Sequence, residues 1–258
     1  NIKKTELKDI SGISFNVLAR LGKKETVSME SIEKICTVLN CNIGEMMDII
    51  PDNNNHRFTT IELFAGAGGL ALGIEKAGFD TLGLIEYDKN AADTLQHNRS
   101  NWRVINDDIT NISKLDLEDY FSLKKGELDL LSGGAPCQSF SYAGNRLGLE
   151  DARGTLFYHY AKFLKKLQPK MFIFENVKGL LNHDHGRTYK TILDIFEQEG
   201  YTIKDTQIKV MNAWDYGVPQ KRERLITVGI RNDLASKIHF EFPNPHEYKP
   251  VLKDILLD

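Results

Sequence analysis

From residue 59 onward, short apolar runs alternate with longer amphipathic segments, and this alternation limits the possible folds more than any other feature. The pairs are "TTIELF" before "LALGIEKAG", "TLGLIEY" before "NAADTLQHN", "LDLLS" before "TLFYHYAKFLKKL" and "MFIFENV" before "YKTILDIFEQEG". A repeated strand-then-helix order favours parallel strands joined by crossover helices. We therefore predict an α/β fold with a doubly wound, mostly parallel sheet, in which ligands bind at the carboxyl ends of the strands.

A smaller all-α domain is predicted before the linker "PDNNNHR", where a proline and three consecutive asparagines interrupt all periodicity. Two helical patterns flank the turn "SGIS", and a third, with Ser28 as its predicted N-cap, places Ile32, Ile35, Cys36 and Leu39 on one apolar face. Such a turn between helices is typical of a helix-turn-helix. A small helical cap or dimerisation unit is the alternative.

The N-terminal stretch resembles a Cro/repressor-type DNA-binding domain whose first helix is cut off. The resemblance implies that "SFNVLARLGKK" is the recognition helix. The DNA contacts that it implies are Ser14, Asn16, Arg20, Lys23 and Lys24. We expect a helix-turn-helix domain over residues 1–50, a linker over 51–58 and a catalytic domain over 59–258.

Composition excludes several classes of protein. The chain has no run of about 18 apolar residues and no signal-peptide segment, so we predict a cytoplasmic protein with no membrane partner. Its three cysteines form no CxxC pair, which favours free thiols over a zinc site. The histidines of "NHDHGRT" are expected to be solvated, so no metal site is predicted. The net charge of -3 does not indicate a nucleic-acid partner.

A glycine-rich turn follows the first predicted strand of the sheet. Gly66, Gly68 and Ala71 fit the pattern G-x-G-x-x-G/A, and Glu86 lies about 20 residues further on, where an acidic side chain binds ribose hydroxyls. Asp108, in "NDDIT", is placed to accept a hydrogen bond from an adenine, with a helix N-cap as the alternative role. These residues alone predict a nucleotide-like cofactor and leave NAD and FAD open.

A cysteine stands in a Gly-rich turn where "LDLLS" ends. Cys137 follows Pro136, and nearby positive charge would present its thiol as a thiolate nucleophile. Arg222 and Arg224 are candidates for that charge, because alternate residues of an extended segment project to one side. Glu175 ends an apolar run, where partial burial would keep it protonated as an acid or hydrogen-bond donor. Its alternative role is an ion pair with one of these arginines.

Five motifs occur in the order and at about the spacing of the DNA (cytosine-5) methyltransferase family, which the chain resembles over residues 59–230. They are "ELFAGAGG", "GGAPCQSFSYAG", "DARGTLF", "ENV" and "QKRER". The resemblance implies a Rossmann-like methyltransferase that transfers a methyl group from S-adenosyl-L-methionine to carbon 5 of a flipped-out cytosine in double-stranded DNA, releasing S-adenosyl-L-homocysteine. It also implies the modification enzyme of a restriction-modification system, with possible autoregulation through operator DNA bound by the helix-turn-helix.

The same resemblance assigns residues to roles. Cys137 forms the covalent adduct at ring carbon 6, Glu175 acts at ring nitrogen 3, and Arg222 and Arg224 complete the catalytic set. The cofactor set is Phe64, Ala65, Gly66, Gly68, Gly69, Glu86, Tyr87, Asp108, Ile109, Pro136 and Leu156. The substrate set is Gln138, Ser139, Ser141, Asn176, Val177 and Gln220.

The chain departs from the family after Ile230, where neither a target-recognition region nor the C-terminal motifs are visible. We therefore expect that this chain alone could be inactive, and that the whole enzyme acts as a monomer. A tRNA cytosine-5 methyltransferase and a DNA-binding transcriptional regulator with an inactive methylase half are the alternative functions.

Overall fold

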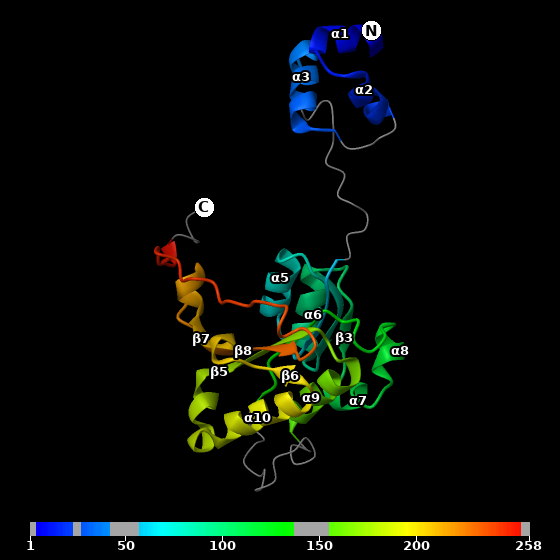
Figure 1. Ribbon diagram of the computed structural model, residues 1–258. Helices are drawn as coiled ribbons and strands as arrows, with labels where there is room; N and C mark the ends of the chain where they lie inside the picture. Colours follow the sequence, from blue (N-terminus) through cyan, green and yellow to red (C-terminus); the bar gives the residue numbers. More distant parts are fainter. Residues whose placement is uncertain (1–3, 23–26, 42–56, 137–154, 254–258) are drawn as a thin grey trace. The chain divides into compact units, whose positions relative to one another are not determined.

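The computed structural model describes residues 4–22, 27–41, 57–136 and 155–253 (Figure 1). The chain divides into two compact units, Asn1–His56 and Arg57–Asp258, which we describe separately. Within the described ranges, no helix has the length and apolar character needed to cross a membrane.

The N-terminal unit is all-α, as predicted. Its helices are α1 (Lys4–Ser11), α2 (Phe15–Gly22) and α3 (Met29–Leu39). The turn between α1 and α2 contains Gly12 with a φ of +67°, and Ser28 caps α3 by accepting a hydrogen bond from the backbone N–H three residues on. Ile32 and Ile35 are buried, but Leu39 is 41% exposed. The predicted apolar face is therefore wrong at Leu39, which lies in the last turn, beside the left-handed C-cap.

The second unit is built on a sheet of eight strands in the order β3-β2-β1-β4-β5-β8-β6, with β7 also paired to β8. The strands are β1 (Thr59–Leu63), β2 (Asp80–Glu86), β3 (Val104–Asn106), β4 (Leu130–Gly133), β5 (Met171–Val177), β6 (Tyr201–Thr202), β7 (Ile208–Asn212) and β8 (Glu223–Arg231). Neighbours from β3 to β5 are parallel, whereas β8 is antiparallel to β5, β6 and β7. The predicted mostly parallel sheet is confirmed.

Helices cover both faces of this sheet (Figure 1). They are α5 (Gly69–Lys76), α6 (Lys89–Asn98), α7 (Ile109–Ile112), α8 (Leu117–Phe121), α9 (Leu156–Leu167) and α10 (Arg187–Gln198), with 3-10 turns at Lys178–Gly186, Asp205–Gln207 and Ala213–Tyr216. The larger core joins Leu63 and Phe174 to α7–α10, and a smaller one joins Leu84 to α5 and α6. Phe157, Tyr160 and Phe163 of α9 are fully buried, which identifies the aromatics of this helix as core residues.

The strand order reverses between β1 and β4, which lie side by side at the centre of the sheet. At such a switch point the connections leave the two strands in opposite directions, so the loops at their carboxyl ends leave a crevice between them. The glycine-rich turn after β1 and the segment after β4 therefore border the same region.

Candidate active site

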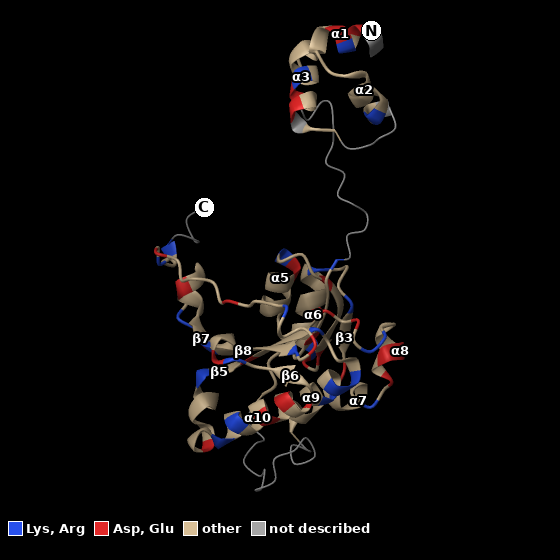
Figure 2. Cartoon of the chain, viewed as in Figure 1, with Lys and Arg blue, Asp and Glu red and all other residues tan. Residues whose placement is uncertain are grey.

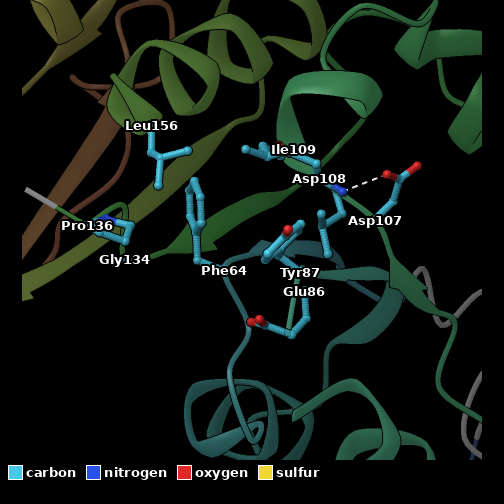
Figure 3. A pocket seen from close by; sticks show the side chains of 10 residues that line it. Phe64, Glu86, Tyr87, Asp107, Asp108, Ile109, Gly134, Pro136 and Leu156 are labelled. Carbon is cyan, nitrogen blue, oxygen red and sulfur yellow. Dashed lines mark hydrogen bonds between the residues drawn. The ribbon is translucent and has the colours of Figure 1, made fainter. Parts of the chain in front are cut away.

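A cavity of about 520 Å³ opens at the carboxyl edge of the sheet (Figure 3). Its walls come from the segments that follow β1, β2, β3 and β4 and from the start of α9. The lining residues are Phe64, Ile85, Glu86, Tyr87, Asp107, Asp108, Ile109, Gly134, Pro136 and Leu156. Seven of these, namely Phe64, Glu86, Tyr87, Asp108, Ile109, Pro136 and Leu156, belong to the cofactor set expected from the sequence. Residues on four separate strand ends thus meet in one cavity.

Beyond Phe64, the glycine-rich turn contributes no residue to the lining of this cavity. Ala65, Gly66, Gly68 and Gly69 do not line it: Ala65 packs in the smaller core, and Gly69 is the first residue of α5. Gly68 has a φ of +88°, and a Cβ there would lie 2.5 Å from Cδ2 of Leu95. The backbone conformation and the close helix packing both require glycine at this position.

Glu86 ties the loop after β1 to the loop after β2. Its Oε2 accepts a hydrogen bond from the Gly66 N–H at 2.7 Å, and its Oε1 accepts one from the Asp88 N–H at 2.7 Å. Each carboxylate oxygen has two lone pairs, so both can accept a further bond from a ligand. The carboxylate is therefore fixed in place and still able to bind hydroxyl groups.

Two adjacent aspartates follow the neighbouring strand β3 and also line the cavity. Asp108 takes the alternative role considered above, because its Oδ1 caps α7 by accepting from the Thr110 N–H at 2.8 Å. Asp107 Oδ1 in turn accepts from the Asp108 N–H at 2.6 Å, as Figure 3 shows. Sequence reasoning missed Asp107, together with Ile85 and Gly134, although the doubled aspartate of "NDDIT" was a visible signal.

The described lining residues include the carboxylates Glu86, Asp107 and Asp108 and contain no lysine or arginine. Like charges repel strongly at close range. Such a cavity therefore disfavours a pyrophosphate and suits a ligand that is neutral or positively charged. In the described part of the chain, no group of three His, Cys, Asp or Glu side chains is arranged to hold a metal ion.

An ion pair lies beside the cavity at the end of β5. The Nε of Arg224 is 2.9 Å from Oε1 of Glu175, and the side chains are 25% and 30% exposed. Oε2 of Glu175 leans over the neighbouring strand end, since a Cβ on Gly134 would lie only 2.6 Å from it. Arg222 lies one residue before β8 and is exposed, and among the described residues its guanidinium has no carboxylate partner. The ion pair foreseen for Glu175 is present, with Arg224 as its partner.

Asn176 holds the segment that leads to Cys137. Its side chain is buried, its Nδ2 donates to the carbonyl of Ala135 at 2.9 Å, and its Oδ1 accepts from the Val177 N–H at 2.9 Å. Val177 is 49% exposed, and Gln220 is exposed too. The contacts of these three residues with substrate stay predictions, and the observed role of Asn176 is to fix the backbone next to Pro136.

Several predicted site residues lie outside the described residues: Cys137, Gln138, Ser139, Ser141, Lys23 and Lys24. In the N-terminal unit, Ser14 is exposed and its hydroxyl accepts from the Val17 N–H at 3.3 Å, at the start of α2. Asn16 is exposed and Arg20 is half-buried. The predicted DNA contacts that are described therefore lie in and just before α2.

The fold matches those of solved methyltransferases. A crystal structure of a candidate DNA modification methyltransferase encoded within an E. coli prophage superposes with a TM-score of 0.64 at 28% identity, over 78% of this chain and 54% of that one. Spodoptera frugiperda DNMT2 shares the fold, with a TM-score of 0.54 at 21% identity over 73% of this chain and 57% of that one. The sheet and the cavity at its carboxyl edge thus define a protein of the methyltransferase fold class.

The chain belongs to the C-5 cytosine-specific DNA methylase family, whose model matches residues 58–258. The model of the Cro/C1-type HTH DNA-binding domain matches residues 1–52. Type II methyltransferase M.Sau96I of Staphylococcus aureus is 50% identical over 213 residues, 82% of this chain and 48% of the relative. M.PspPI of Psychrobacter sp. (strain TA137) is 47% identical over 228 residues, 88% of this chain and 52% of the relative. The chain thus spans about half the length of these relatives.

Proposed function

We propose that this chain is the catalytic part of an S-adenosyl-L-methionine-dependent DNA (cytosine-5) methyltransferase, with S-adenosyl-L-homocysteine as its product. One observation carries the proposal. Gly134 and Pro136, in the segment directly before Cys137, line the cavity, and the Glu175 of the Glu175–Arg224 ion pair lies against Gly134. A cofactor, an acid and a nucleophile would therefore converge on one short stretch of backbone. The family membership reported above supports the same activity.

The charge of the cavity favours S-adenosylmethionine over the dinucleotides that the glycine turn alone leaves open. NAD and FAD carry a pyrophosphate, which the lining carboxylates would repel. When bound, S-adenosylmethionine would supply a methyl group carried on a positively charged sulfur. Glu86 would bind the ribose hydroxyls, and the ring of Tyr87, which is 75% exposed, would pack against the adenine. These roles agree with the observed polarity of the cavity.

The chain's own residues would prepare the base for methylation. The Cys137 thiolate forms a bond to ring carbon 6 of a flipped-out cytosine, and Glu175 transfers a proton to ring nitrogen 3, which accepts the displaced electron pair. Carbon 5 then becomes nucleophilic, because the addition interrupts the ring conjugation. After methylation, a base removes the carbon 5 proton, the carbon 5–carbon 6 double bond re-forms and the thiolate leaves. The proton on nitrogen 3 returns to Glu175, which gives neutral 5-methylcytosine. A soft, reversible nucleophile such as cysteine suits this sequence of steps.

Mechanism-based trapping tests this chemistry. The complete open reading frame is incubated with cofactor and DNA duplexes that contain 5-fluorocytosine, whose fluorine cannot leave as a proton does. We expect a denaturation-resistant protein–DNA adduct that is absent from Cys137→Ala and present in Cys36→Ala, a control in the N-terminal unit. An adduct that survives in Cys137→Ala contradicts the assigned nucleophile. Trapping on tRNA but not on DNA would favour the RNA alternative, and trapping on neither would favour the inactive regulator.

We further propose that the full protein is a cytoplasmic monomer that modifies double-stranded DNA in a restriction-modification system, while its N-terminal unit binds operator DNA. Basic and acidic residues are interspersed over the helices in Figure 2, and the net charge of the chain is -3. Operator binding would then depend on base contacts from α2 more than on a general positive field. Gel-shift titration of the promoter region of the protein's own gene tests this: Asn16→Ala should weaken operator binding, and equal weakening on unrelated DNA would contradict it.

A further inference from the structure

Glu62 is a carboxylate in the middle of the central strand β1, and its side chain is 2% exposed. Its Oε2 has no hydrogen-bond partner among the described residues. Acidic side chains are almost never fully buried without a partner, because removing a charge from water is strongly unfavourable. The mechanism above assigns this residue no role. A buried and unpartnered acid in a central strand therefore calls for a physical explanation.

The strand register places Glu62 on the same face of the sheet as Glu175. Glu62 pairs with Ser132 of β4, Ser132 pairs with Ile173 of β5, and Glu175 lies two residues beyond Ile173. In-register neighbours and alternate residues along a strand share a face. On this face β4 contributes the fully buried Ser132 hydroxyl, and Gly134, which has no side chain, directly follows β4.

The carboxylate of Glu175 is directed toward Gly134. Arg224 holds its Oε1, whereas its Oε2 lies over Gly134, on the side of β4. Any larger residue at Gly134 would crowd the Glu175 carboxylate, because its Cβ would already lie 2.6 Å from that oxygen. The Ser132 Oγ, like the Glu62 Oε2, has no hydrogen-bond partner of good geometry among the described residues.

The surroundings of Glu62 favour its neutral form. Burial, which is the largest effect, and the nearby Glu175 carboxylate together raise the pKa of Glu62 to about 8, although the adjacent Ser132 hydroxyl acts to lower it. Its register neighbour on β2 is Leu84, and no described lysine or arginine acts on it. Arg224, on β8, pairs with Glu175 instead. At neutral pH Glu62 therefore holds a proton, on the face of the sheet that also carries the Glu175–Arg224 ion pair.

We propose that Glu62 is a positioning residue that stores the proton that Glu175 delivers to the substrate, an assignment that rests on the proposed function. In the transfer, the O–H bond of Glu62 breaks and an O–H bond forms on the Glu175 carboxylate. Glu62 is left as the carboxylate, so the pair carries one negative charge before and after. The Ser132 hydroxyl would relay the proton once it forms a hydrogen bond to each acid, because a hydroxyl accepts one hydrogen bond while donating another.

The stored proton can be observed without any enzymatic activity. Infrared difference spectra of the full-length protein should show a carboxylic-acid carbonyl band at pH 7 that disappears as the pH rises through about 8. The band should be absent from Glu62→Gln. It should persist in Glu199→Gln, the matched control, because burial also raises the pKa of Glu199. Absence of a band that depends on Glu62 at pH 7 would overturn the proposal.

The delivery of the proton is tested by the pH dependence of single-turnover methyl transfer. Glu62→Gln keeps the shape of the side chain but cannot release a proton, so the rate should fall by at least about tenfold. The alkaline limb of the pH–rate profile of Glu62→Gln should move to lower pH, and its cofactor affinity should be unchanged. Ser132→Ala should also slow the reaction and shift the alkaline limb to lower pH. It takes the place of Glu62→Gln in this test if Glu62→Gln does not fold. If the alkaline limb of the pH–rate profile does not shift in variants that fold, the proposal is overturned. A wild-type protein that transfers no methyl group contradicts the proposed function, while the infrared test still stands.

Discussion

Arg224 Nε lies 2.9 Å from Oε1 of Glu175, and this contact joins two adjacent strands that run in opposite directions. In the register of β5 with β8, Arg224 is opposite Val177 and Ile226 is opposite Glu175. The first residues of β8 therefore lie beside the last residues of β5. Because β8 is antiparallel, the motif that precedes it reaches the carboxyl edge of the sheet, where the cavity lies.

Removing Arg224 should impair methyl transfer by the full-length protein more than it impairs folding. The guanidinium orients Glu175 through a half-buried contact, so we expect Arg224→Ala to lower the single-turnover rate by about 10-fold to 100-fold, less than the ~10²–10⁴-fold that a general acid contributes, because Glu175 itself remains. Arg224→Lys should be intermediate, because an ammonium lacks the planar fork. Arg187→Ala, which removes an exposed ion pair with Asp184, is the control and should leave the rate unchanged. Equal losses in both alanine variants would contradict the assigned role.

The aromatic ring of Tyr87 should contribute to cofactor affinity. It is 75% exposed at the edge of the cavity, where it can stack on a flat base, and such stacking is worth about 1–3 kcal/mol. Tyr87→Ala should therefore weaken S-adenosylmethionine binding about tenfold, as measured by titration calorimetry. Phe58→Ala removes another exposed ring outside the cavity and should have no effect. Unchanged affinity in Tyr87→Ala would exclude the stacking role.

Two neighbouring glycines should respond differently to the same substitution. Gly68→Ala introduces a Cβ 2.5 Å from Leu95 Cδ2 at a φ of +88°, so we expect a loss of about 1–3 kcal/mol in the free energy of unfolding and weaker cofactor binding. Gly69→Ala meets nothing within 4 Å and lies in α5, so it should be neutral or slightly stabilising. Denaturant unfolding measures both. Similar stabilities of the two variants would show that the turn can relax.

Asp129 should stabilise the catalytic unit from the opposite end of the sheet. Its 5% exposed carboxylate accepts from the Thr59 N–H at 2.8 Å and from Lys170 Nζ at 2.6 Å. We expect Asp129→Asn to lower the free energy of unfolding by about 1.5–3 kcal/mol. Asp80→Asn, which alters an exposed ion pair with Arg57, should have a smaller effect. Tryptophan fluorescence reports on this unit, because the only tryptophans of the chain are Trp102 and Trp214.

The contribution of Asp129 should depend on pH with a definite sign. Burial acts to raise the pKa of Asp129, but the hydrogen bonds from Lys170 and Thr59 outweigh it and the pKa is lowered. A depressed carboxyl pKa stabilises the folded state above the unfolded-state value, about 3.9, and this stabilisation disappears as the pH falls through the folded value. The difference between wild type and Asp129→Asn should therefore be full at pH 7 and shrink below about pH 4. A constant difference down to pH 2 would contradict the assignment.

Local sequence was sufficient for the features that depend on neighbouring residues along the chain. Apolar runs followed by amphipathic segments predicted the parallel strands and their helices, because periodicity reflects which side chains are buried. Phe64, Glu86, Tyr87 and Asp108 each lie at or just after the end of a strand. Since the carboxyl ends of parallel strands meet at one edge, their convergence on a single cavity could be anticipated.

Strand order and strand direction decided which of the acidic and basic side chains lie close together. Periodicity identifies a strand but says neither which strand lies beside it nor whether that neighbour is parallel. Only the antiparallel placement of β8 brings Arg224, and not Arg222, to Glu175. Only the adjacency of β1, β4 and β5 buries Glu62 on the face that carries Glu175. The sequence by itself determined the layers of this protein and the edge at which ligands bind, whereas long-range strand pairing, which joins residues as far apart as Glu62 and Ser132, decided the partners of each acid.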